Sequence, residues 1–70
     1  MRVYDTVEIN GRKFAILLDD ENKRAYEAIW SGNGWETDFS CPAVGIDSFD
    51  IAGMLDFEGV QKMGYTFYWI

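Results

Sequence analysis

Residues 3–18 read VYDTVEINGRKFAILL. Apolar and polar side chains alternate along residues 3–9 and again along residues 13–18, and Asn10-Gly11 joins the two runs. Asn-Gly between alternating runs is the strongest short-range signal for a β-hairpin, because both residues tolerate a positive φ. The stretch therefore predicts two antiparallel strands. Its apolar members are Val3, Val7, Ile9, Phe14, Ile16 and Leu18.

A second hairpin is expected over residues 24–40. The stretch 24–30 fits a strand with Glu27 opposite its aromatic side chains, but its apolar spacing also permits a helix. A second Asn-Gly turn, at Asn33-Gly34, favours the strand. Beyond this turn Trp35, Thr37 and Phe39 alternate with polar residues, so two hairpins in series would form a four-stranded meander.

The remainder of the chain predicts a helix and a last strand. Pro42 ends the alternating pattern, because proline lacks the amide that a central strand needs. Asp47 or Ser48 is expected to cap a helix that runs, with a break, as far as Met63, where Gly64 supplies a left-handed cap. Residues 65–70 (YTFYWI) are strongly β-prone and predict the final strand.

The predicted fold class is α+β. It is a small antiparallel β-meander of about five strands, in the sequence order ββββαβ, with one short broken helix packed on the sheet. Seventy residues form one domain, 1–70, and the opening Met suggests a complete short gene product. Aromatic residues make up 17% of the chain and supply much of the buried area that so small a core needs.

The chemical inventory argues against catalysis. Histidine is absent, so the usual general base and the commonest metal ligand are both missing. Cys41 is the only cysteine, which excludes an intramolecular disulfide and favours a reducing compartment. No stretch resembles a signal peptide or a membrane span. We expect a cytoplasmic, non-enzymatic protein with no catalytic residue, no cofactor, no metal site and no membrane partner.

Charge is the most informative feature for function. The net charge is −6, and residues 31–70 hold six acids against Lys62 alone. Phosphate backbones attract Lys and Arg, so this half should not bind nucleic acid directly. It should instead dock on a basic protein, above all one that itself binds nucleic acid. The candidate partner-binding residues are Glu36, Asp38, Asp47, Asp50, Asp56 and Glu58, with Trp35 and Tyr68 as aromatic anchors.

Two functions follow from these observations. The leading one is a small acidic binding protein, in its specific form a phage- or mobile-element-type inhibitor that mimics nucleic acid and blocks a host nucleic-acid-binding or defence enzyme. The alternative is a structural or accessory module, joined as a homodimer through its terminal strand, whose acidity serves only solubility. The distinguishing feature is whether the acids gather on one face or scatter.

Overall fold

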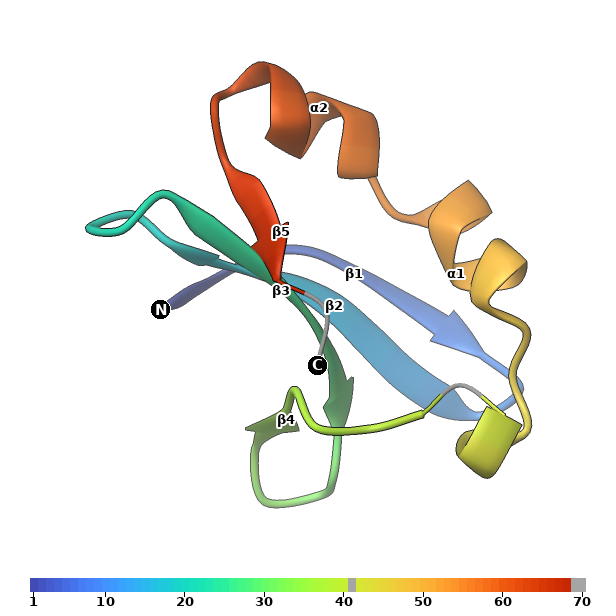
Figure 1. Ribbon diagram of the computed structural model, residues 1–70. Coiled ribbons are helices and arrows are strands. Elements are labelled where there is room, and N and C mark those ends of the chain that lie inside the picture. The colour runs from blue at the N-terminus through green and yellow to red at the C-terminus, as the bar shows by residue number, and fades with distance from the viewer. Residues whose placement is uncertain (41, 69–70) are drawn as a thin grey trace.

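The computed structural model describes residues 1–40 and 42–68 and has the predicted α+β fold (Figure 1). The predictions that fall on Cys41, Trp69 and Ile70 lie outside the described residues. The element order is β1 (Arg2–Ile9), β2 (Arg12–Asp19), β3 (Arg24–Trp30), β4 (Trp35–Glu36), the 3-10 turn η1 (Pro42–Val44), α1 (Ser48–Met54), α2 (Phe57–Lys62) and β5 (Thr66–Tyr68).

The hairpin of β1 and β2 forms where it was predicted. Ile9 pairs with Arg12, and the two residues between them have positive φ, 51° at Asn10 and 78° at Gly11. A two-residue turn of this kind matches the right-handed twist of the strands that it joins. The hairpin prediction is confirmed.

A β-bulge near Tyr4 corrects the predicted faces of β1. Val3 pairs with Leu17 and Asp5 with Ile16, so β1 advances two residues while β2 advances one. The extra residue reverses the alternation upstream of the bulge. Val3 is therefore exposed, whereas Tyr4 packs against the main core together with Val7. The prediction that Val3 and Val7 lie on the same face was wrong, because strict alternation in the sequence does not show where an extra residue is inserted.

The second hairpin is confirmed, but its last strand is shorter than expected. The stretch 24–30 is strand β3, and the turn closes where the Ser31 amide donates to the Gly34 carbonyl at 2.9 Å. The strand predicted over residues 35–40 ends at Glu36. Phe39 is not on the face of Trp35: its ring lies 5.9 Å from that of Phe14, within the core on the other side of the sheet.

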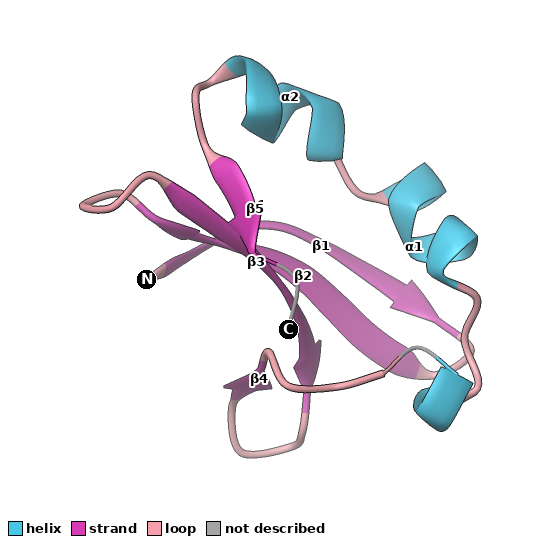
Figure 2. Ribbon diagram, in the orientation of Figure 1, coloured by secondary structure: helices cyan, strands magenta, loops and turns pink. Residues whose placement is uncertain are grey.

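The predicted broken helix is confirmed as α1 and α2, which together cover one face of the sheet (Figure 2). The α1 helix ends at Met54, with Leu55 as its C-cap, and α2 ends in a turn where Gly64, at φ 95°, donates its amide to the Gln61 carbonyl at 3.0 Å. The core lies between the helices and the sheet, and its buried members are Phe14, Ile16, Leu18, Ala25, Ile29, Ile46, Ile51, Leu55, Val60 and Tyr65.

The last strand joins the sheet in parallel to β3. Thr66 pairs with Arg24, and the Thr66 amide donates to the Lys23 carbonyl at 2.9 Å. Both β4 and β5 lie beside β3, so the sheet runs β1-β2-β3 and then divides between them. Phe67 packs on the core while Tyr68 is exposed, as expected for consecutive residues of one strand.

Candidate partner-binding site

Two of the predicted partner-binding acids cap the short helices. Asp47 precedes α1, and its Oδ1 accepts the Phe49 amide at 2.9 Å. Asp56 precedes α2, and its Oδ1 accepts the Gly59 amide at 3.0 Å. Each carboxylate satisfies an amide that has no partner within its helix, and its charge suits the positive end of the helix dipole. Both acids therefore help to define the helices that display them.

Asp56 also ties α2 to the sheet. Its Oδ2 accepts the Tyr4 hydroxyl at 2.9 Å, and its backbone amide donates to Asp5 Oδ2 at 3.1 Å. The hydrogen bond to Asp56 raises the pKa of the Tyr4 phenol, because the donated proton is held by a negative acceptor. This carboxylate consequently has an internal function in addition to its exposure.

The other two helix acids are more open to solvent. Glu58 Oε1 forms an ion pair with Lys62 Nζ, one helical turn away, at 3.2 Å, and both side chains are largely exposed. An exposed pair of this kind contributes at most about 1 kcal/mol. Asp50 lies exposed in the first turn of α1. These carboxylates are available to a partner at little cost.

Exposed apolar side chains accompany these acids on the helices. Phe49 is 82% exposed although it stands between Asp47 and Asp50, and Met54 and Met63 are exposed as well. We define the acidic helix layer as Asp47, Phe49, Asp50, Met54, Asp56, Glu58 and Met63. The sequence reasoning missed Phe49. A signal was available, since Ile51 and Leu55 form the inward stripe and a residue two positions before Ile51 falls on the opposite side of a helix.

The remaining predicted residues lie elsewhere. Glu36 is in β4, which Figure 1 places at the other end of the molecule from α2, and the exposed Asp38 lies two residues later in the chain. Trp35 packs with residues of the sheet face that the helices do not cover, and Tyr68 lies beside Tyr26 on that face. The structure therefore places four of the six acids in or just before the two short helices and places both aromatic anchors on the opposite face of the sheet.

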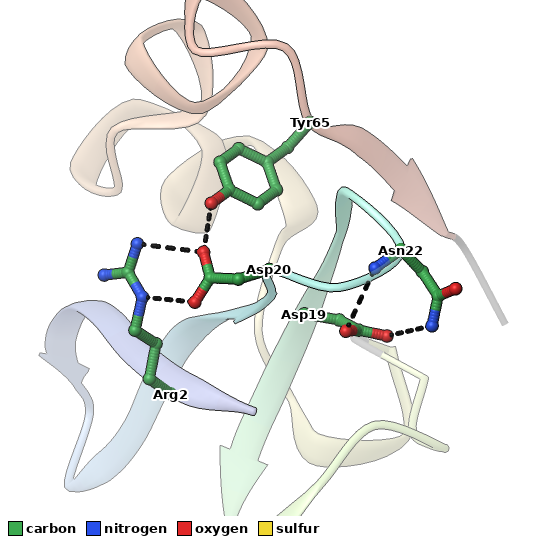
Figure 3. A network of polar contacts seen from close by, with 5 residues as sticks. All are labelled: Arg2, Asp19, Asp20, Asn22 and Tyr65. Carbon is green, nitrogen blue, oxygen red and sulfur yellow. Dashed lines mark hydrogen bonds and ion pairs between the residues drawn. The ribbon is translucent and has the colours of Figure 1, made fainter.

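A polar network surrounds Asp20 at the turn between β2 and β3 (Figure 3). Asp20, in the turn between β2 and β3, accepts two hydrogen bonds from the Arg2 guanidinium and one from the Tyr65 hydroxyl. These donors lower the pKa of Asp20 to about 2, with Arg2 as the main cause. In the same turn Asn22 donates to Asp19 and lowers the pKa of that carboxyl. This network joins β1, the turn and the start of β5, and serves the fold.

The part of the chain that is described shows no gathering of three or more His, Cys, Asp or Glu side chains able to hold a metal ion. Within the same residues, the helices are all too short or too polar to span a bilayer. No protein-family model, no curated protein and no solved structure matches this chain.

Proposed function

We propose that the protein is a non-enzymatic binding protein that docks its acidic helix layer on a basic surface of another protein. Phe49 carries this proposal. Burying a phenylalanine side chain is worth about 1.5–3 kcal/mol, yet Phe49 is left 82% exposed in a chain too small to waste apolar area. Flanked by Asp47 and Asp50, it has the composition of a binding anchor with a charged rim.

The charge of this layer supports a basic partner. Among its residues Asp47, Asp50, Asp56 and Glu58 are acids, and Lys62 is the one base of residues 31–70. Opposite charge steers association and disfavours wrong partners. A narrower form of the proposal is that the partner is a nucleic-acid-binding or defence enzyme of a host, and that the acids occupy its phosphate-binding groove. The chain would then act as an inhibitor of the phage or mobile-element type, at work in the cytoplasm.

The alternative function, an accessory module whose acidity only keeps it soluble, has its own support. Asp47 and Asp56 are occupied as helix caps, and Glu58 is paired with Lys62. A net charge of this size is also common in small soluble domains. The two functions differ in whether binding depends on Phe49 and on the exposed acid beside it.

The experiment is affinity purification of the partner from the native host, followed by titration of the purified partner against variants of the full chain. Phe49→Ser and Asp50→Lys should each weaken binding by at least about tenfold. Association should slow as salt is raised from about 0.1 to about 1 M, because screening shortens the Debye length from about 10 to about 3 Å. DNA or RNA should compete with this chain for the partner.

One control and one further variant show which acids contribute to binding. Glu21→Lys makes the same charge change in the exposed turn between β2 and β3 and should leave affinity close to that of the wild type. Glu36→Lys with Asp38→Lys tests whether the acids near β4 share the interface. Equal losses in Asp50→Lys and Glu21→Lys would mean that only net charge matters. If neither salt nor Phe49→Ser changes the affinity, the proposal is rejected and the accessory-module function is favoured.

A further inference from the structure

Among the described residues, the sheet face turned away from the helices carries an aromatic surface that neither α1 nor α2 covers. A second apolar cluster, formed by Ala15, Leu17 and Ala28 with Tyr26 and Trp35 packed against it, contains no residue of α1 or α2. Figures 1 and 2 show both helices on one side of the sheet. We call this surface the open face. Its exposed or half-buried large members are Val3, Tyr26, Trp30, Trp35 and Tyr68, and Leu17 is buried beneath them.

Two cross-strand aromatic pairs dominate the open face. Trp30 of β3 and Trp35 of β4 pair directly across the two strands, and their ring centroids lie 5.1 Å apart in an edge-to-face arrangement. Tyr26 and Tyr68 are partners of β3 and β5, at 5.8 Å. Trp30 is 44% exposed and Tyr68 43%. Large apolar side chains left open on one continuous surface are typical of an interaction site.

Charge distinguishes this face from the rest of the molecule. Its charged side chains include Glu8 and Lys13, which pair directly across β1 and β2. They also include Arg24, whose guanidinium lies 4.4 Å from the Tyr68 ring centroid. Asp19, the cross-strand partner of Arg24, is the other acid of this face. Two acids thus face two bases here, whereas the acidic helix layer would repel a copy of itself. Two chains that each carry −6 approach most easily through their open faces.

We propose that the open face is a homodimer interface, on which a second copy of this chain packs its own open face. The contact would be isologous, with a twofold axis that lets Glu8 and Lys13 of each copy meet the opposite charge of the other. Two sheets would stack about 10 Å apart as in a sandwich. Both acidic helix layers would point outward, so the inference does not depend on the proposed function.

The size of the molecule fits this contact. The principal extents of the molecule are 30, 25 and 18 Å. A face bounded by the two longer extents has an area of about 750 Å², the product of 30 and 25. A standard interface buries about 800 Å² on each partner. This outline is slightly below that value, so a specific dimer would use nearly the whole of the open face.

The sheet edges are less suited to self-association. The described part of β5 is only three residues long, and short edge strands are one way in which proteins suppress edge pairing. The β1 edge is interrupted by its bulge, and Asp5 accepts both the Thr6 amide at 3.0 Å and the Asp56 amide at 3.1 Å. A second copy therefore meets the face rather than an edge.

Sedimentation equilibrium of the untagged full chain, from about 10 μM to about 1 mM, tests the inference. We expect a reversible monomer–dimer equilibrium that strengthens as salt is raised, because salt screens the repulsion between two negative chains. The proposed partner binding should weaken with salt, so failure of either idea can be told from failure of the other.

Three variants assign the interface. Trp30→Ser should raise the dimer dissociation constant by at least about tenfold. Val3→Lys should also weaken the dimer, although one added positive charge changes the net charge from −6 to −5 and eases repulsion. This variant tests the interface if Trp30→Ser fails to fold. Phe49→Ser, on the helix layer, should leave dimerisation unchanged. A chain that stays monomeric at 1 mM overturns the proposal. So does a dimer whose dissociation constant is unchanged by Val3→Lys, or one that Phe49→Ser abolishes.

Discussion

Arg2 and Asp20 form a two-point ion pair across 18 residues of sequence. The Arg2 Nε donates to Asp20 Oδ2 at 2.8 Å, and Nη2 donates to Oδ1 at 3.2 Å. The Tyr65 hydroxyl donates to the same Oδ1, so one carboxylate holds the N-terminal strand, a turn and the entry to the last strand together. The charged form of Asp20 is therefore linked to the folded state.

Acid should weaken the fold through Asp20. Its pKa is about 2 in the folded chain and 3.8 in the ordinary state, so the stabilisation is complete above pH 4 and is lost as the pH falls towards 2. Urea unfolding followed by tryptophan fluorescence should show the free energy of unfolding declining through this window. Asp20→Asn should flatten the decline without abolishing it, because the pKa of Asp19 is lowered too. Asp38→Asn, on an exposed carboxylate, is the control and should retain the wild-type slope.

Alkali should weaken the fold through Tyr4. Its pKa is raised above the ordinary value of 10 by the hydrogen bond to Asp56, so the stabilisation is present below pH 10 and is lost at higher pH as the phenol ionises. Tyr4→Phe should be less stable than the wild type at pH 7 and should lose less stability between pH 9 and pH 11. Identical alkaline slopes for the two chains would contradict the assignment. Ultraviolet titration of the phenols gives an independent measurement.

Two helix glycines should respond differently to alanine. A Cβ at Gly53 meets no atom within 4 Å, so Gly53→Ala should stabilise the chain by about 0.5–1 kcal/mol. A Cβ at Gly59 would lie 2.2 Å from Asp56 Oδ2 and would displace the capping carboxylate. The free energy of unfolding of Gly59→Ala should therefore be lower than that of Gly53→Ala by about 0.5–2 kcal/mol, the usual value of an N-cap.

The Gly59 prediction has an internal control. In an Asp56→Ala background no carboxylate remains to be displaced, so Gly59→Ala should then become stabilising. Thermal unfolding of the four chains of this cycle gives the coupling between the two positions. Additive effects would show that the contact of Gly59 with Asp56 has no energetic consequence.

The inner and outer sides of α1 should differ in sensitivity. Ile51 is fully buried in the core, and Ile51→Ala should cost about 2–5 kcal/mol, a large part of the stability of a domain of this size. Met54, three residues later, is 58% exposed, and Met54→Ala should change the free energy of unfolding by less than about 0.5 kcal/mol. Denaturant midpoints of the two variants measure the contrast.

Local signals in the sequence predicted the elements well. Asn10-Gly11 indicated the first hairpin, and Asp47 and Gly64 marked helix ends, because each acts through its own backbone conformation or a nearby amide. Asn33-Gly34 located the second turn, although the positive φ in that turn belongs to Gly32. The bulge at Tyr4, the short β4 and the parallel pairing of β5 were not predictable in this way. They depend on contacts between segments far apart in the chain, which a local pattern does not encode.

The candidate site was predicted only in part, for the same reason. The acids could be counted, but their grouping depends on where the helix layer and β4 lie in space. Phe49 was missed because an exposed aromatic resembles a core residue until the inward stripe of α1 is fixed. The aromatic anchors Trp35 and Tyr68 were assigned to the acidic surface, whereas they lie on the opposite face of the sheet.

The parallel placement of β5 has a consequence for the order in which the chain folds. The β1–β2 hairpin closes across two residues, but Tyr65 reaches Asp20 across 45 residues, and ordering a loop of that length costs roughly 3 kcal/mol of chain entropy. Local hairpins form within about 10 μs, whereas long-range pairing waits for the segments that it must connect. The last strand therefore docks on a preformed hairpin, and its amides should be the first of the sheet to exchange with solvent deuterium.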